Sequence, residues 1–144
     1  MATIKHLFHI TSPREKVYKA ISTIEGLSNW WTIQTSGESK IDGIIEFGFS
    51  GHSIIKMKVE DMKENETVIW EYSSGFDSWA GTIIVFHLDD HDGKTRVRFE
   101  HEGWKETNDE YAAVTFTWGR YLESLRQYCQ KGKGEAFGSE NYRT

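Results

Sequence analysis

Six histidines are the side chains of this chain that could act as acids, bases or metal ligands near neutral pH. His6 and His9 lie three residues apart, which places them on opposite faces of a strand. His87 and His91 flank the end of a predicted strand. No pair has the spacing of a zinc finger or of an HExxH motif. We therefore expect no metal site and no cofactor.

His101 is the histidine that the sequence best places in an interior. Val97, Phe99 and His101 alternate along one strand, so they share the face that points inward. A histidine inside a pocket could orient the polar end of a ligand or act as an acid or base. His6 is a second candidate on the same reasoning. A core histidine with satisfied hydrogen bonds explains both residues as well, and we assign no catalytic residue.

The sequence contains few side chains that could act as catalytic nucleophiles. The only cysteine, Cys129, falls on the apolar face of a predicted helix, and no histidine is near it in the sequence. We expect a buried structural thiol there. One cysteine cannot form a disulfide within the chain, which fits a reducing, cytoplasmic setting. No GxSxG motif and no glycine-rich phosphate loop occur.

Aromatic residues make up 14% of the chain, which is more bulk than a solid core of this size needs. Lining a partly hollow interior would use the surplus, because apolar and aromatic side chains form most ligand pockets. A closely packed aromatic core is the alternative. Gly119 joins the candidates because a glycine within a helix costs about 1 kcal/mol relative to alanine, which favours a neighbour that needs the space. The candidate pocket residues are Trp30, Trp31, Phe47, Met57, Trp70, Tyr72, Trp79, Phe99, His101, Trp104, Thr115, Phe116, Trp118 and Gly119.

The element that must position these residues is one long helix over residues 107–132. Thr107 and Glu110 have the spacing of a capping box, and Gly132 can close the helix in a left-handed conformation. Positions spaced four and three apart form one apolar stripe, which must face a sheet. The stripe consists of Tyr111, Thr115, Trp118, Leu122, Leu125 and Cys129.

The rest of the chain reads as strands and two short helices. Residues 3–10 alternate as a strand, Ser12-Pro13 opens a helix that Gly26 ends, and residues 27–31 form a second helical turn. From residue 41 to residue 102 the period of two predicts five consecutive strands, with a hairpin at Asp92-Gly93. Alternation leaves open which face of residues 83–88 points inward.

These elements predict an α+β fold in which a curved antiparallel six-stranded sheet wraps around the long C-terminal helix, with two short helices between the first two strands. Residues 1–132 form one domain. Residues 133–144 are polar and rich in glycine, so we expect them to be a mobile tail.

Charge and hydropathy exclude several classes of partner. The formal charge is −5, with 22 acidic and 17 basic residues spread along the chain, and this disfavours nucleic-acid binding. No apolar run approaches the ~20 residues of a membrane span, and the first ten residues lack the pattern of a signal peptide. We expect a cytoplasmic protein that does not insert into membranes.

The sequence also resembles a known family. The order of elements, the Trp30-Trp31 pair and the segments SPREKVYKAIS, VIWEY, FEHEGW and WGRYLESLRQYCQKGKG resemble the START-like (SRPBCC) helix-grip superfamily. Within it, the likeness is to the branch related to the C-terminal domain of the activator of Hsp90 ATPase. The resemblance implies a Bet v 1-like sheet that grips the C-terminal helix, with an apolar cavity between them. Members bind lipids, polyketides, hormones or other hydrophobic molecules, and a minority are cyclases or hydrolases.

Our hypothesis is a protein that binds a hydrophobic or amphipathic small molecule in that cavity, as a monomer or homodimer, with no catalytic step assigned. One alternative is an enzyme of the cyclase or hydrolase kind that uses His101 or His6 as acid or base. A second is a chaperone-related interaction module, which would expose an apolar patch on the outer face of the sheet.

Overall fold

The computed structural model describes residues 1–51 and 54–143. Its elements follow one another as β1 (Ala2–Ile10), α1 (Arg14–Ser22), α2 (Ile24–Trp30), β2 (Gln34–Gly37), β3 (Ile44–Gly48), β4 (Ile54–Lys63), β5 (Thr67–Ser74), the 3₁₀ turn η1 (Asp77–Trp79), β6 (Ile83–His91), β7 (Lys94–Trp104) and α3 (Asp109–Lys131). The predicted α+β class with a long C-terminal helix is confirmed.

The described strands form one antiparallel sheet of seven strands, in the order β1-β7-β6-β5-β4-β3-β2. The prediction of six strands is therefore wrong, because β2 was not expected. The residues of β2 are polar and mostly exposed, so they give no alternation of apolar side chains. β2 forms one edge of the sheet, and short polar edge strands discourage further pairing.

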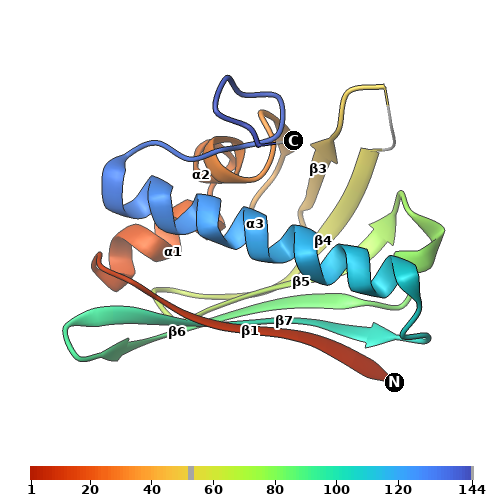
Figure 1. Ribbon diagram of the computed structural model, residues 1–144, viewed down its shortest axis with the longest axis horizontal. Helices are drawn as coiled ribbons and strands as arrows, with labels where there is room; N and C mark the ends of the chain where they lie inside the picture. The colour runs from red at the N-terminus through yellow and green to blue at the C-terminus, as the bar shows by residue number, and fades with distance from the viewer. Residues whose placement is uncertain (52–53, 144) are drawn as a thin grey trace.

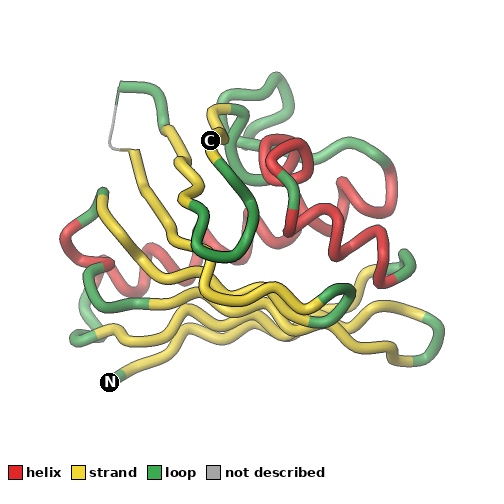
Figure 2. Tube along the Cα trace, turned by 180° about the vertical axis from the view of Figure 1, so that it is seen from behind, coloured by secondary structure: helices red, strands yellow, loops and turns green. Residues whose placement is uncertain are grey.

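The sheet is curved, and α3 lies across its inner face (Figure 1). β3 and β4 rise out of the plane of the other strands, as seen from both sides (Figures 1 and 2). The pairing of β4 with β5 shifts register between Lys56 and Met57 and again between Val59 and Asp61. Such bulges bend the strand that carries them. They account for the change of direction along β4.

Alternation places the apolar side chains of the strands on the face toward α3. On β6 the inward residues are Ile84, Phe86 and Leu88, each at most 1% exposed, which settles the face that the sequence left open. The outer face is charged. Arg96 donates two hydrogen bonds to Asp89 there, and these bonds hold the pKa of the Asp89 carboxyl well below its ordinary value.

Only the C-terminal end of α3 agrees with the prediction from the sequence. Gly132 closes the helix with φ of 78°, as predicted. The N-cap is Asn108 and not Thr107, because the Asn108 side chain accepts a hydrogen bond from the Tyr111 amide at 3.0 Å. Cys129 is buried on the inner stripe, and burial raises the pKa of its thiol to about 12. A structural thiol is the consequence.

The residues predicted to begin and to end the first short helix have other roles in the structure. Pro13, and not Ser12, precedes the first turn of α1. Gly26 does not end a helix but lies within α2. A Cβ at Gly26 would stand 2.5 Å from the carbonyl oxygen of Ala20. The glycine therefore allows α1 and α2 to approach closely, and Trp30 Nε1 donates to the same carbonyl at 2.9 Å.

Residues 133–143, for which the sequence predicts a mobile tail, run back beside α2 (Figure 1). The Phe137 amide donates to the Trp31 carbonyl at 2.8 Å, and the Ile33 amide donates to the Phe137 carbonyl at 3.1 Å. The Glu135 amide donates to Ser124 Oγ on α3 at 2.6 Å. These bonds attach the segment to the domain at several points. Thr144 lies outside the described residues.

No described helix is long and apolar enough to cross a membrane.

Two glycines in helices give opposite predictions for stability. At Gly119 a Cβ would meet only His6 Cε1 at 4.0 Å, so Gly119→Ala is expected to raise the free energy of unfolding by about 1 kcal/mol. Gly26→Ala is expected to lower it by about 1–3 kcal/mol, because the methyl group would overlap the Ala20 carbonyl. Urea unfolding of both variants measures the change. A Gly119→Ala variant less stable than the wild type would contradict the open space described at this position.

Candidate ligand-binding site

The interior between the sheet and α3 is filled by aromatic rings over much of its length. Trp31 stacks on Trp70 at 6.0 Å between ring centroids and lies 4.1 Å from Phe47. The Phe99 and Trp118 rings are 4.6 Å apart. All five side chains are at most 2% exposed. This part of the interior is a closely packed core.

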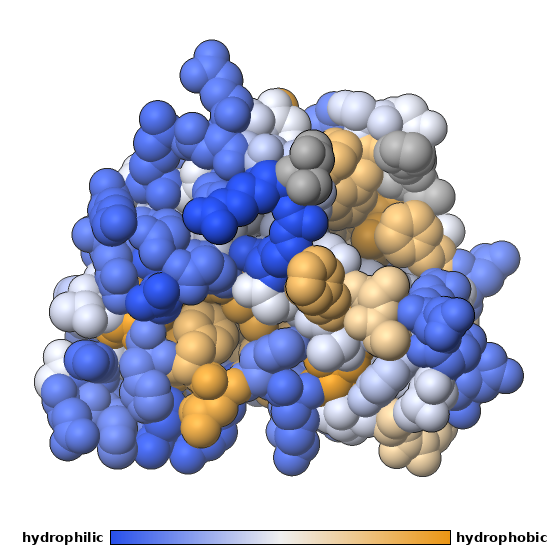
Figure 3. All heavy atoms as spheres, in the orientation of Figure 1, coloured by the Kyte–Doolittle hydropathy of each residue, from blue (hydrophilic) through white to orange (hydrophobic). Residues whose placement is uncertain are grey.

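A half-open cavity of about 310 Å³ remains where the N-terminal half of α3 faces β3, β4 and η1. Apolar surface gathers around this side of the molecule (Figure 3). Most of the described lining side chains are aromatic or aliphatic; Glu110, Thr117 and Tyr121 carry oxygen atoms, and the three tryptophans each carry an indole N–H. The cavity is lined by Trp31, Phe49, Ile55, Phe76, Trp79, Glu110, Val114, Thr117, Trp118 and Tyr121.

The structure places the predicted pocket residues at four locations. Trp31, Trp79 and Trp118 line the cavity. Another group is buried in the core and consists of Trp30, Phe47, Met57, Trp70, Phe99 and His101, with the partly buried Tyr72 packed against it. Trp104 is 3% exposed and borders a small surface depression beside Asp77.

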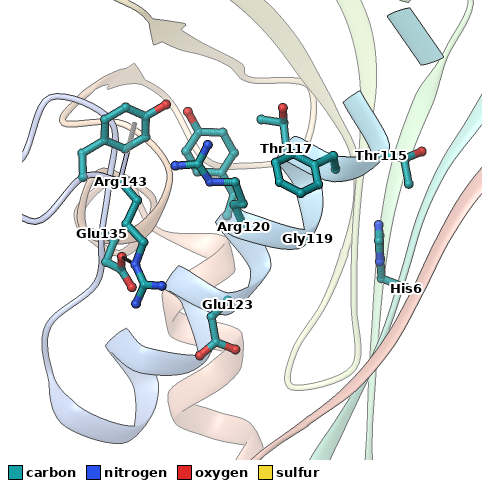
Figure 4. Close-up of a pocket in the computed structure, with 11 residues that line it drawn as sticks. His6, Thr115, Thr117, Gly119, Arg120, Glu123, Glu135 and Arg143 are labelled. Atoms are coloured by element: carbon teal, nitrogen blue, oxygen red, sulfur yellow. Dashed lines mark hydrogen bonds and ion pairs between the residues drawn. The ribbon is translucent and has the colours of Figure 1, made fainter. Parts of the chain in front are cut away.

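The remaining predicted residues, Thr115, Phe116 and Gly119, line a different space. This outer groove of about 510 Å³ crosses the outer side of α3 and is lined by His6, Thr115, Phe116, Thr117, Gly119, Arg120, Tyr121, Glu123, Glu135, Tyr142 and Arg143. His6 reaches toward α3 on one side of it, and Glu135 and Arg143 lie on the other (Figure 4).

The outer groove is the larger space, but its charged groups are engaged with one another. Arg143 pairs with Glu135, and Arg126 donates to Glu123 at 2.8 Å. The Arg120 guanidinium lies 5.9 Å from the centre of a tyrosine ring. The charged side chains of the outer groove therefore have partners within the protein, whereas the smaller cavity is lined mainly by aromatic and aliphatic side chains. We therefore take the smaller, mostly apolar cavity as the candidate site.

Several cavity residues were not among the candidates from the sequence. Phe49 and Ile55 belong to strand patterns that the sequence showed, and Val114 and Tyr121 flank the predicted stripe of α3. Val114, Thr117 and Tyr121 recur at spacings of three and four, so they form a second helical stripe beside the main one. This spacing in the sequence could have predicted these three residues as part of a binding site.

His101 does not line the cavity but forms a buried hydrogen-bond relay with its neighbours. Trp118 Nε1 on α3 donates to His101 Nδ1 at 3.1 Å. His101 Nε2 lies 3.0 Å from Thr82 Oγ1, and the Thr82 hydroxyl donates to the Trp79 carbonyl at 2.6 Å. Since Nδ1 accepts, the proton of the neutral imidazole is on Nε2 and is donated to Thr82. We call these four residues the His101 relay.

Burial lowers the pKa of His101 from its ordinary 6.5 to about 3, because the charged imidazolium would lose its hydration. The ring is fully buried, and both of its nitrogens have partners. A neutral histidine that is hydrogen-bonded on both sides holds elements together. The second histidine candidate, His6, lies on β1, its ring is 6.2 Å from Phe99, and it borders the outer groove. The two histidines therefore do not share the cavity.

Metal-ligating side chains do not converge within residues 1–51 and 54–143: no group of three His, Cys, Asp or Glu side chains could hold an ion there. His9 and His91 come together on the outer side, with ring centroids 5.1 Å apart. His91 is already engaged, since Arg96 lies 3.3 Å from its Nδ1.

Residues 11–130 match the family model described as Activator of Hsp90 ATPase homolog 1-like protein. The chain belongs to this family. The resemblance stated from the sequence is thereby confirmed. The Aha1 dimer from Colwellia psychrerythraea, known from its solution structure, is 37% identical, with 93% of this chain and 100% of that chain covered and a TM-score of 0.86.

Solved structures with lower sequence identity are similar to this chain in fold alone. Protein MLL2253 from Mesorhizobium loti is 17% identical, covers 88% of this chain and 95% of its own, and has a TM-score of 0.76. Protein BH1534 from Bacillus halodurans is 22% identical, with coverage of 90% and 98% and a TM-score of 0.70. No curated protein matches the chain. The family assignment therefore assigns no function to individual residues of this chain.

The His101 relay makes stability depend on pH in a defined direction. The unfolded chain binds a proton at His101 below pH 6.5, whereas the folded chain resists protonation down to about pH 3. The free energy of unfolding therefore falls by about 1.4 kcal/mol per pH unit between these values. At pH 5.0 the wild type is expected to have lost about 2 kcal/mol through this group relative to pH 7.5.

His101→Gln is expected to be less stable at pH 7.5, by about 1–3 kcal/mol, and to lack this part of the pH dependence. Urea unfolding at pH 7.5 and 5.0 measures both effects. The matched control is His87→Gln, since that side chain is exposed. The same loss between the two pH values in His101→Gln as in the wild type would show that His101 is not the buried neutral group.

Proposed function

We propose that the protein binds a hydrophobic or amphipathic small molecule in the cavity between the sheet and α3, in the manner of a helix-grip protein. The observation that carries the proposal is the cavity of about 310 Å³ with its mostly apolar wall. Ligand pockets have volumes of about 300–1,000 Å³, so this one takes a small molecule. Family membership supports the proposal at the level of the fold.

The wall of the cavity is mostly apolar and has few polar groups. Trp31, Trp79 and Trp118 contribute indole rings, and Thr117 and Tyr121 contribute hydroxyl groups. Such a lining binds a ligand mainly through removal of apolar surface from water, while a small number of polar groups fix its orientation. Among the described residues that line the cavity there is no histidine. The proposal is therefore binding, with no catalytic step.

A substitution that fills the cavity tests the proposal. Val114 is only partly buried and lines the cavity, so Val114→Trp can occupy the space without displacing the core. With 2-naphthylmethanol as probe and tryptophan fluorescence as readout, the wild type is expected to bind. The variant is expected to bind at least about tenfold more weakly, at unchanged thermal stability.

Arg120→Ala is the matched control, because Arg120 lines the outer groove and not the cavity. Native mass spectrometry of the protein from its own host, followed by extraction after denaturation, identifies any molecule that occupies the site. Binding that Arg120→Ala abolishes and Val114→Trp leaves intact would move the site to the outer groove. Absence of binding by the wild type would refute the proposal.

We propose in addition that the chain forms a homodimer. The relative from Colwellia psychrerythraea is described as a dimer and is 37% identical. Phe116 and Ile54 are 69% and 52% exposed, and such apolar side chains favour burial against a partner. Location in the cytoplasm stays a prediction from the sequence.

Sedimentation velocity tests the dimer. The wild type is expected to sediment as a dimer at micromolar concentration, and Phe116→Glu is expected to sediment as a monomer because a carboxylate cannot be buried unpaired. The control is Leu7→Glu, a residue of similar exposure, 61%, on β1. A monomeric wild type, or equal effects of the two substitutions, would contradict the proposed dimer face.

A further inference from the structure

Among the described residues that line the cavity, one carries a charged side chain, Glu110. It belongs to the first turn of α3 and so stands at the N-terminal end of that helix. The partial positive charge of a helix N-terminus stabilises a carboxylate. The charge at this end of the cavity is therefore negative.

The position of the Glu110 carboxylate is set by one neighbour. The Ser78 hydroxyl, in η1, donates a hydrogen bond to Glu110 Oε2. Within the described part of the chain, no lysine or arginine forms an ion pair with Glu110, whereas other carboxylates such as Glu123 and Asp89 have arginine partners. The protein thus orients this carboxylate without neutralising it.

The surroundings of Glu110 add negative charge. Asp109 is its neighbour in the first turn of α3, and Asp77 precedes Ser78 in η1. Although Glu110 is exposed to water, a ligand carboxylate placed in the cavity would meet this charge beside a mostly apolar wall. Repulsion therefore disfavours fatty acids and other anionic amphiphiles.

The aromatic wall favours the opposite charge. Trp31, Trp79 and Trp118, together with Phe49 and Phe76, line the same cavity as Glu110. The faces of tryptophan and phenylalanine rings attract cations, and tryptophan does so most strongly. Aromatic rings and a carboxylate without a cationic partner are groups with which proteins bind ammonium ions.

We infer that the ligand of this cavity is a hydrophobic amine, with an apolar body against the tryptophans and a protonated nitrogen beside Glu110. The inference rests on the proposed function, since it names the chemical class that the same site selects. Glu110 is then the residue that determines specificity.

The test compares three probes of equal size that differ in charge: 2-naphthylmethylamine, 2-naphthylmethanol and 2-naphthoate. Titration calorimetry at pH 7 and low salt is expected to show that the amine binds at least about tenfold more tightly than the carboxylate, with the alcohol between them. This ratio corresponds to about 1.4 kcal/mol. Added salt is expected to reduce it, because screening weakens the charge interaction.

Glu110→Gln keeps the size of the side chain and removes the charge, so the affinities of the amine and the carboxylate should then agree within about twofold. Asp109→Asn is the matched control. It removes the same charge from the same helical turn but does not line the cavity, and the preference for the amine should persist.

The possible results separate the two proposals. If the alcohol binds but the amine has no advantage over the carboxylate, or if Glu110→Gln leaves the ratio unchanged, the inference fails and the proposed function stands. If none of the three probes binds, both fail. If Asp109→Asn abolishes the preference as fully as Glu110→Gln, general charge at the end of α3 explains it and the role of Glu110 is refuted.

Discussion

The hydrogen bonds of the His101 relay determine where α3 lies on the sheet. Trp118 is the only member on α3, His101 belongs to β7, and Thr82 and Trp79 belong to the segment between β5 and β6. A buried donor or acceptor left without a partner costs about 1–3 kcal/mol, so Trp118, His101 and Thr82 must keep their relative positions. The relay therefore fixes the distance between helix, sheet and η1, and this distance defines the cavity.

The aromatic residues serve two purposes that depend on position along α3. Near Phe99 and Trp70 the rings contact one another and leave the interior solid. Toward the N-terminal half of α3, Trp31, Trp79 and Trp118 belong to this core and also border the cavity. The cavity is thus held open by rigid walls, which reduces the ordering that binding would otherwise require.

The spacing of apolar residues, together with the residues that begin and end helices and turns, predicted most of the fold. The alternation around Phe99 placed His101 inward correctly, and Gly132 marked the end of α3. β2 was missed because polar residues on an edge strand carry no pattern, and Gly26 was misread because its reason is contact with Ala20, which is tertiary. The cavity was harder. Trp31 and Trp70 are the same residue type and stack on each other, yet only one lines it, and periodicity does not distinguish them.

The most direct test of the cavity as the binding site is an NMR measurement of nuclear Overhauser effects between 2-naphthylmethanol and the protein. Occupation of the cavity predicts contacts from the naphthyl protons to the methyl groups of Val114 and Ile55, which line it from α3 and β4. Contacts to Phe116 and Tyr142 in their place would put the ligand in the outer groove. That result would contradict the role assigned to the cavity.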